Sequence, residues 1–405
     1  DLECKVSPAR RKVLEGALIQ SFANFGTNPV TVFTSGEGVA TALDLTNGNQ
    51  PFLGTTRLLP SFATSVTPLG SLLVSAPNPG PSTDAMIIIF GSAEDPNSQN
   101  RSAGRSYQYT DEANGNSTGS FNWEIAQVIF GRAIFDATTV GGGLVAETVL
   151  VAGDSLNRNG DDRSSLEIWE YDANNNNIYQ SARQVTTNGP VLSAFAMTEG
   201  DFLTPPFLMV QTFSDVGDVL RLGGGNHATQ TVGTLGPDPK RIRCAGALCV
   251  VSHGGKQGER ASGITWFEWD GTSANVTLRG RADFGNATTL AGTVGIDLIE
   301  FTGGEIAVLA TGFNTNKVFE VLISADGRRF GQIDNDAPAG CVNPGHGAWY
   351  IEDDRLRYLL TCFGGGYAIN QTRLTEELTL QDGLPNQAPP SGASGSGGGS
   401  GGIGE

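Results

Sequence analysis

The stretch Ala85–Gly91 (AMIIIFG) is followed, after a loop of small residues, by Arg105–Tyr109 (RSYQY), in which polar and aromatic side chains alternate. The same pair of runs recurs as Thr148–Gly153 (TVLVAG) and Leu166–Tyr171 (LEIWEY). Short β-branched or alternating runs that are bounded by turn residues are typical of β-strands. The sequence therefore repeats a strand–loop–strand unit.

Similar pairs of runs occur from one end of the chain to the other, and we count seven units. The further pairs are 17–22 with 30–33, 207–211 with 219–222, 248–252 with 264–269, 306–310 with 318–322, and 358–362 with 367–369, the last with an outer strand at 377–380. Recurrence at a period of roughly 40–70 residues without helical patterns predicts a β-propeller. We expect an all-β fold with seven blades of four-stranded antiparallel sheets; six or eight blades stay open.

On these runs the chain resembles the seven-bladed β-propeller superfamily over about residues 10–382. This superfamily includes lactonase-like and other extracellular propellers. The chain lacks the Gly-His and Trp-Asp spacing of WD40 repeats and the double glycine of kelch repeats. The resemblance therefore concerns architecture, and no functional residue is carried over from it.

Composition limits the classes of partner. The 405 residues include 56 glycines, which suits an all-β chain with many tight turns. The formal net charge is −17, with 42 acidic and 25 basic residues, and this excess disfavours nucleic acid and anionic membranes as partners. A negative charge of this size is compatible with a role in solubility through repulsion between molecules, or with a cationic partner. The chain contains no stretch of about 18 apolar residues, so the sequence predicts no transmembrane segment.

The five cysteines favour an oxidising compartment. Cys244 and Cys249 flank a small-residue turn, and Cys341 and Cys362 flank a second expected hairpin, so two disulfides are predicted. Cys4 is left over and could form an intermolecular link. With the missing initiator Met, these pairs indicate a secreted or cell-surface protein; buried free thiols and a trimmed chain are the alternatives.

Five sequons would permit N-glycosylation in a eukaryotic secretory route, although a chain this rich in Asn, Ser and Thr contains about as many by chance. They begin at Asn100, Asn116, Asn275, Asn286 and Asn370. Carbohydrate is also a conceivable ligand, because Trp266, Trp269 and Trp349 could offer stacking surfaces. In alternating strands such tryptophans more commonly pack between sheets.

A ligand would meet a propeller at the loops that follow the second strand of each blade. The polar residues at these places are Glu94, Asp95, Asp154, Asp215, His253 and Asn314. The resemblance to calcium-dependent propeller hydrolases implies that such a ring could hold a hard cation. The alternative is that Asp and Asn make ordinary Asx turns there. The three histidines lack metal-ligand spacing and no nucleophile motif occurs, so we assign no catalytic residue.

One segment has closely spaced oxygen ligands of the kind that calcium prefers: Asp154, Asn157, Asn159 and Asp161, with Gly160 allowing a sharp turn. Arg158 interrupts the pattern, and a solvated acidic turn is the alternative reading. Calcium is the one cofactor that the sequence suggests.

After residue 383 the composition changes to a Pro-containing and then Gly/Ser-rich stretch. We therefore expect a propeller over 1–383 and a linker or stalk over 384–405, which could mediate association with other chains. The sequence favours a non-catalytic interaction or assembly module, for example a subunit of a surface filament or lattice. The alternative is a secreted calcium-dependent hydrolase of the lactonase-like kind.

Overall fold

A computed structural model describes most of the β-rich part of the chain. The described residues are 18–25, 28–34, 39–44, 52–57, 66–74, 85–93, 102–111, 121–130, 133–140, 148–154, 164–172, 178–186, 191–196, 207–211, 218–223, 226–231, 239–245, 248–254, 262–269, 276–284, 293–312, 316–339, 341, 344–352, 355–362, 367–374 and 378–383. Within these segments the chain forms 28 strands, and none of the residues is helical.

The strands follow one another in groups of four in the first half of the chain. The first group is β1 (Leu18–Phe25), β2 (Asn28–Thr34), β3 (Val39–Asp44) and β4 (Phe52–Arg57). The second is β5 (Val66–Val74), β6 (Ala85–Ala93), β7 (Ser102–Asp111) and β8 (Phe121–Phe130). The third is β9 (Ala133–Val140), β10 (Thr148–Asp154), β11 (Ser164–Asp172) and β12 (Ile178–Thr186).

The second half continues this pattern and departs from it only at the end. The next group is β13 (Val191–Ala196), β14 (Phe207–Gln211), β15 (Asp218–Gly223) and β16 (Asn226–Thr231). It is followed by β17 (Pro239–Ala245), β18 (Leu248–His253), β19 (Gly263–Trp269) and β20 (Val276–Asp283). Then come β21 (Thr293–Glu300), β22 (Ile306–Gly312), β23 (Lys317–Ile323) and β24 (Arg329–Asp336). The last strands are β25 (Pro344–Glu352), β26 (Arg355–Cys362), β27 (Tyr367–Gln371) and β28 (Gln381–Asp382).

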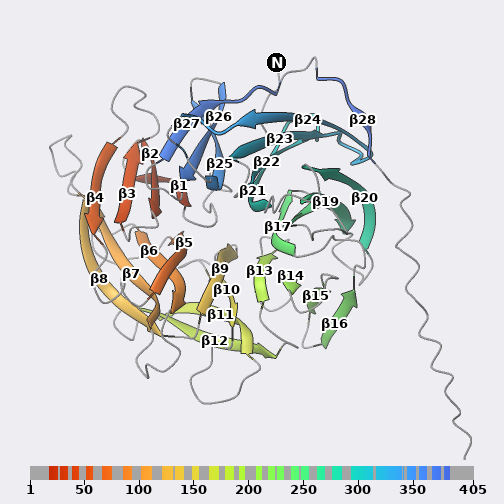
Figure 1. The fold of residues 1–405 in the computed structure, drawn as a ribbon. Coiled ribbons are helices and arrows are strands. Elements are labelled where there is room, and N and C mark those ends of the chain that lie inside the picture. The colour runs from red at the N-terminus through yellow and green to blue at the C-terminus, as the bar shows by residue number, and fades with distance from the viewer. Residues whose placement is uncertain are drawn as a thin grey trace, which may run out of the picture.

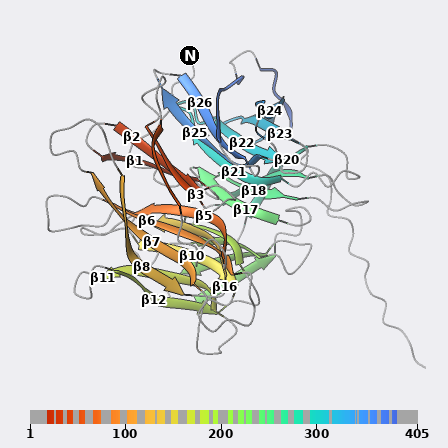
Figure 2. The same ribbon diagram turned by 60° about the vertical axis from the view of Figure 1, so that its left-hand side comes forward.

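Consecutive strands within a group pair antiparallel, so each group is a meander. The groups β5–β8 and β9–β12 are joined into one eight-stranded sheet, but the link between them is the single pair Ser92↔Ala133 of β6 and β9. Figure 2 shows the orange strands β6 and β7 and the yellow-green strands β11 and β12 in the same half of the molecule. The last group has three paired strands, β25–β27, because β28 pairs with β24 of the preceding sheet.

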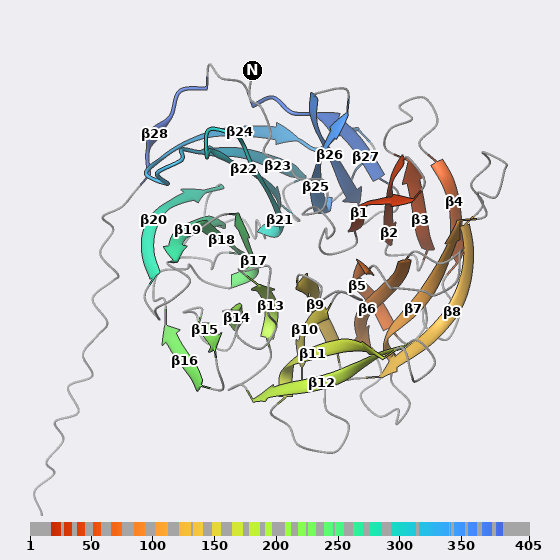
Figure 3. The same cartoon turned by 180° about the vertical axis from the view of Figure 1, so that it is seen from behind.

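The first strands of the groups contact one another in cyclic order. Contacts join β1 to β5, β5 to β9, β9 to β13, β13 to β17, β17 to β21 and β21 to β25, and β25 also contacts β1. Figures 1 and 3 show these strands around the centre of the molecule, with β4, β8, β12, β16 and β20 toward the outside. The sheets are thus arranged around a common centre, and each is packed against its neighbours.

The described core lies between neighbouring sheets. One cluster fills the space between β17–β20 and β21–β24, and another lies between β21–β24 and β25–β27. The middle strand β22 (IAVLATG) is buried along its whole length. A strand covered on both faces is expected to be largely apolar and not to alternate, and Thr311 is the one polar side chain of β22.

Large aromatic side chains fill these interfaces. Trp266 and Trp349 are both fully buried, so the packing reading of these two tryptophans is confirmed. Trp266 lies edge-on to Phe330 of the next sheet, with 5.3 Å between the ring centroids. Phe284 stacks on Phe319 at 4.1 Å. The side chain of Trp269 is outside the described part.

The quoted apolar runs all fall on strands, but the expected outer strand at 377–380 is wrong. Residues 378–380 are not in a strand, and the short strand that follows them, β28, extends the neighbouring sheet instead of the last one. The reason lies at Gly331 of β24, where a Cβ would be 2.6 Å from Cδ2 of Leu378. The absence of a side chain there leaves room for Leu378 and Leu380, and the chain is therefore held against β24.

Candidate functional site

The structure describes two of the residues predicted at the ligand mouth or the calcium loop. Asp154 is the last residue of β10, and His253 is the last residue of β18. The others lie outside the described residues: Glu94, Asp95, Asn157, Asn159, Asp161, Asp215 and Asn314. Among the described residues no group of three or more His, Cys, Asp and Glu side chains could hold a metal ion. The calcium site and the mouth therefore stay predictions.

His253 is buried within its sheet. Its exposed fraction is 0%, and its Nε2 lies 3.4 Å from the hydroxyl oxygen of Thr265 on β19. In the strand register it is opposite Gly263 on one side and Pro239 on the other. A ligand would need this end of the sheet to open before it could touch the imidazole.

A cluster of buried charges connects β9 and β17, the first strands of two groups. Asp136 of β9 is fully buried and forms an ion pair with Arg241, whose Nη1 is 3.1 Å from Oδ1. It also accepts hydrogen bonds from both terminal nitrogens of Arg243 at 3.1–3.3 Å. Arg241 and Arg243 are two residues apart in β17, so both side chains reach the same side of the strand. Buried charges are tolerated when they are paired in this way.

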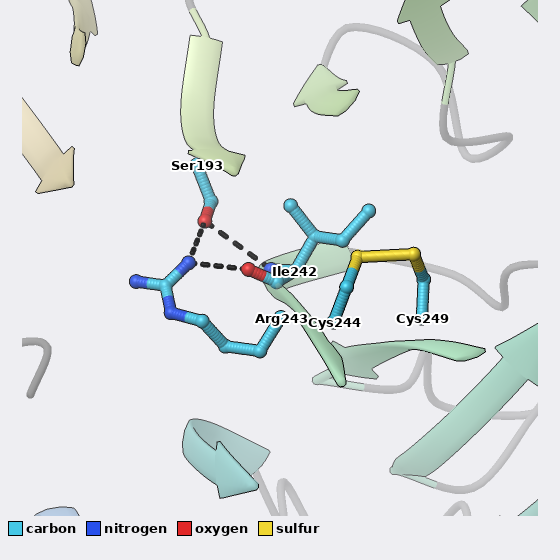
Figure 4. The surroundings of a disulfide bond; sticks show 5 residues. All are labelled: Ser193, Ile242, Arg243, Cys244 and Cys249. Carbon is cyan, nitrogen blue, oxygen red and sulfur yellow. Dashed lines mark hydrogen bonds between the residues drawn. A yellow bond between two sulfur atoms is a disulfide. The ribbon is translucent and has the colours of Figure 1, made fainter. Parts of the chain in front are cut away.

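Ser193 of β13 connects the carboxylate with the backbone of β17. Its hydroxyl donates to Oδ2 of Asp136 at 2.6 Å and accepts from the amide of Ile242 at 3.2 Å and from Nη1 of Arg243 at 3.1 Å. Figure 4 shows Ser193 facing Arg243 and Ile242, with Nη1 of Arg243 also bonded to the Ile242 carbonyl. The guanidinium carbon of Arg243 lies 5.7 Å from the ring centroid of Phe195, a cation–π contact.

The cluster continues into the next two groups. Asp297 of β21 acts electrostatically on Arg243, and its Oδ2 accepts a hydrogen bond from the backbone amide of Trp349 in β25 at 2.7 Å. We call Asp136, Ser193, Arg241, Arg243 and Asp297 the inner belt, because they connect β9, β13, β17, β21 and β25 by polar contacts. All five belong to strands that surround the centre of the molecule (Figure 1).

Burial dominates the electrostatics of the inner belt. It raises the pKa of Asp136 from 3.8 to about 6, and this outweighs the lowering by Arg241 and by the hydrogen bond from Ser193. Burial also lowers the pKa of Arg243 well below its usual value, while Asp297 opposes that change. A carboxyl pKa of about 6 still leaves Asp136 ionised at pH 7, so the belt holds a carboxylate between guanidinium groups.

A second polar cluster holds the residues that follow β27 against β23. Glu320 of β23 is fully buried; its Oε1 accepts from Nδ2 of Asn335 at 2.6 Å, and its Oε2 accepts from the Thr372 hydroxyl at 2.5 Å and the Arg373 amide at 2.9 Å. Nη1 of Arg373 donates to Oδ1 of Asn335 at 2.9 Å. We call these four residues the clasp. Burial raises the pKa of Glu320, and burial followed by the charge of Glu320 raises that of Tyr358 to about 12.

The first predicted disulfide is confirmed. Cys244 and Cys249 are directly opposite each other in β17 and β18, with 4.0 Å between their Cα atoms, and their sulfurs are bonded (Figure 4). Cys341 is also disulfide-bonded. The side chain of Cys362 lies outside the described part, as does Cys4, so the pairing of Cys341 with Cys362 stays a prediction.

One predicted glycosylation position is described. Asn370 lies in β27, is exposed, and donates from Nδ2 to the hydroxyl of Tyr358 at 3.2 Å. The sequon threonine, Thr372, belongs to the clasp. The other four sequon positions, Asn100, Asn116, Asn275 and Asn286, lie outside the described residues.

Neither the inner belt nor the clasp was predicted from the sequence. Their signal was present in part: Asp136 and Glu320 each interrupt an otherwise apolar β-rich run, whereas Arg241 and Arg243 stand beside Lys240 in a run that is already rich in charge. A charge within such a run must be paired once the strand is buried. The partner, however, belongs to another group of strands: Asp136 and Arg243 are 107 residues apart in the sequence. The spacing of residues within one run therefore cannot reveal the partner.

No protein-family model matches the chain, and no curated protein matches its sequence. Among solved structures it is similar to BBS1N, crystallised in complex with ARL6DN, with a TM-score of 0.55, 9% identity, and coverage of 93% of this chain and 98% of that chain. It is also similar to a protein assigned as a 6-phosphogluconolactonase from Bacteroides uniformis ATCC 8492, with a TM-score of 0.55, 10% identity, and coverage of 92% and 95%. Such likenesses concern the fold alone, which is all-β and β-propeller-like.

Within the described residues no helix is long and apolar enough to cross a membrane.

Proposed function

We propose that this chain is a seven-bladed β-propeller that serves as a non-catalytic protein-interaction and assembly module outside the cell or at its surface. The blade number is supported by the seven first strands that contact one another in cyclic order. A count of seven requires that β5–β8 and β9–β12 are two separate blades. The single residue pair that connects them, Ser92↔Ala133, supports this separation. The last blade then has three strands of its own.

The inner belt is the observation that carries the functional proposal. Asp136, Arg241 and Arg243 are between 0% and 8% exposed, and they bond to one another across sheet boundaries. Charges used in this way hold the strands around the centre of the molecule in place and are not presented to a substrate. A rigid frame of this kind supports surface loops, and loops carried on a rigid scaffold are where binding residues concentrate.

Two further observations indicate the kind of partner. The similar structure of BBS1N was obtained with a second protein bound, so a propeller-like fold of this length can serve protein recognition. The net charge of −17 favours a partner with a basic surface, because complementary charge accelerates association. Such an association should weaken as the ionic strength rises.

Sedimentation analysis of the purified full chain tests the assembly role. We expect the average mass to increase with protein concentration, and deletion of residues 385–405 to return monomers without lowering the melting temperature. A full chain that stays monomeric at all concentrations and ionic strengths would contradict self-assembly. An unchanged assembly after the deletion would show that the tail is only a spacer.

The alternative, a calcium-dependent hydrolase, rests on the fold likeness to the lactonase-assigned protein. Hydrolysis of a simple lactone that requires calcium and disappears in Asp154→Ala would favour it over the interaction module. Asp334→Ala is the matched control, because Asp334 is an exposed carboxylate on β24 in a different group. We expect no such activity, and a calorimetric titration should show at most weak calcium binding at Asp154, Asn157, Asn159 and Asp161.

A further inference from the structure

The last sheet has an open outer edge at the place where every other group has a fourth strand. Among the described strands, β27 pairs with β26 alone, and the last sheet ends there. The described residues that follow β27 do not extend this sheet, because β28 pairs with β24. Asn370 and Gln371 of β27 are exposed, and Ile369 is half-buried. In the described part of the chain, the outer edge of β27 can thus accept one further strand.

The order of the strands indicates where such a strand would come from. In each complete group the fourth strand is followed by the first strand of the next group, as β8 is by β9 and β20 is by β21. These connections are short, since they lead from Phe130 to Ala133 and from Asp283 to Thr293. In the ring the first strand after the last sheet is β1, because β25 contacts β1. By the same rule, a fourth strand for the last sheet would precede β1 in the sequence.

The sequence before β1 contains a run that suits this place. Residues 2–6 (LECKV) alternate between apolar and charged side chains, which predicts a half-exposed strand, and Pro8 follows as a breaker. The outer strand β20 has the same pattern, with Leu278 and Ala282 on one face and arginines on the other. The run has five residues, as β27 has. Pattern and length therefore both match an outer strand beside β27.

The connecting residues are long enough for this pairing. Neighbouring strands lie about 4.8 Å apart, so a strand beyond β27 would lie roughly 15 Å from β25. Since β25 contacts β1, the chain has to cover about this distance before β1 begins at Leu18. Residues 7–17 can span roughly 35 Å when they are extended. The run can therefore reach the outer edge without strain in the connection.

We propose that the outer edge of β27 is the docking site for residues 2–6, which pair with it antiparallel as the fourth strand of the last sheet. Residues 1–17 lie outside the described residues, and the open edge, the strand order and the alternating run carry the assignment. This inference goes beyond the proposed function and does not depend on it. The contact between β25 and β1 is then reinforced by backbone hydrogen bonds that join the beginning of the series of strands to its last sheet.

Cross-linking within the full chain tests the pairing. The parent variant Cys4→Ser/Lys5→Cys places one new thiol in the run, and Asn370→Cys or Gln371→Cys adds a second on β27. These exposed neighbours face opposite sides of the sheet, so one of them suits either orientation of the run. Thr277→Cys, at an exposed position of the outer strand β20, is the matched control. With a short bismaleimide at low protein concentration, we expect the link to β27 to form in at least ~10-fold higher yield than the link to β20.

Peptide mapping and intact mass distinguish the outcomes of this experiment. A yield on β27 that does not exceed the yield with Thr277→Cys overturns the inference. A link to β27 that occurs only in a product of twice the mass of the chain also overturns it, and would assign the edge to a second copy.

Hydrogen exchange provides an independent measurement. Proline lacks the amide that donates to a neighbouring strand, so Glu3→Pro/Lys5→Pro should release the outer edge of β27. We expect the amides of residues 367–371 to exchange at least ~10-fold faster in this variant than in the wild type. Ala9→Pro/Arg11→Pro, in the connecting residues, is the matched control and should leave this rate unchanged. Equal rates in the two variants would contradict the pairing, and if the first variant does not fold, the cross-linking yield decides.

Discussion

The indole Nε1–H of Trp266 donates a hydrogen bond to the carbonyl oxygen of Gly327, 2.7 Å away, and so joins β19 to the turn between β23 and β24 of the neighbouring sheet. Gly327 has a φ of 69°, a conformation that favours glycine, and the turn is therefore fixed in a form that presents this carbonyl. The contact connects two sheets at a buried point.

Replacing Trp266 by Phe should destabilise the protein because the Gly327 carbonyl loses its donor inside the core. We expect the free energy of unfolding to fall by about 1–3 kcal/mol, the cost of a buried unsatisfied group. Urea unfolding followed by circular dichroism measures the change. Thr277→Ala, at an exposed position in β20, serves as the control, and an equal effect of the two substitutions would contradict this account.

Gly280→Ala should be destabilising for a steric reason. A Cβ at Gly280 would lie 2.6 Å from Cε2 of Trp266 and closer still to Cζ2, and the indole is fully buried and already in contact with Phe330. Overpacking of this kind costs about 1–3 kcal/mol. In Gly303→Ala the three atoms nearest to the added methyl all belong to the end of the Glu305 side chain, which can rotate away, so thermal unfolding should separate the two variants clearly.

Removing the carboxylate of Asp136 should be costly at pH 7. Asp136→Ala leaves Arg241 and Arg243 buried without this acceptor, and breaking a buried pair in this way costs about 3–5 kcal/mol. Asp136→Asn keeps one acceptor oxygen and should cost less. Asp334→Asn, an exposed substitution, should change the free energy of unfolding by less than about 0.5 kcal/mol. An Asp136→Ala protein as stable as the Asp334→Asn control would contradict a structural role of the inner belt.

The pH dependence of stability should report Asp136. Its folded-state pKa of about 6 lies above the unfolded value of 3.8, so the folded protein holds the proton more tightly. Proton binding by Asp136 therefore contributes to the free energy of unfolding. This contribution is complete below pH 4, is lost as the pH rises through 6, and amounts in total to on the order of 3 kcal/mol. The difference in unfolding free energy between the wild type and Asp136→Asn should therefore decline over this window and be constant above pH 7. A flat difference from pH 4 to 7 would show that the carboxyl titrates normally.

Reduction should weaken the hairpin of β17 and β18. The disulfide of Cys244 and Cys249 closes a short loop, and removing it should cost about 2 kcal/mol. Intact-mass measurement after reduction and alkylation should reveal four additional thiols, and peptide mapping should link Cys341 to Cys362. A peptide that links Cys341 to Cys4 would correct the predicted pairing.

The two quoted runs of each unit were predicted as strands because such runs are encoded locally, as the run around Ile87 and Ile88 shows. The partner of β28 could not be predicted in this way, since nothing in residues 377–380 reports the space above Gly331, nearly fifty positions earlier in the chain. The inner belt was missed for the same reason: Asp136 and Arg243 meet only after three sheets have been placed side by side. Residue types alone show that a charge needs a partner, but only the tertiary arrangement identifies it.

The contact between β25 and β1 has a consequence for how the protein could be divided. The first strand of each group contacts the first strands of the two neighbouring groups, and β25 meets β1 although the two strands lie at opposite ends of the series. A cut in a loop between two sheets would therefore expose two interfaces that still complement each other, such as the faces of β13 and β17. Two separately produced halves should find one another and restore the whole ring, and the start of the chain could equally be moved to another loop.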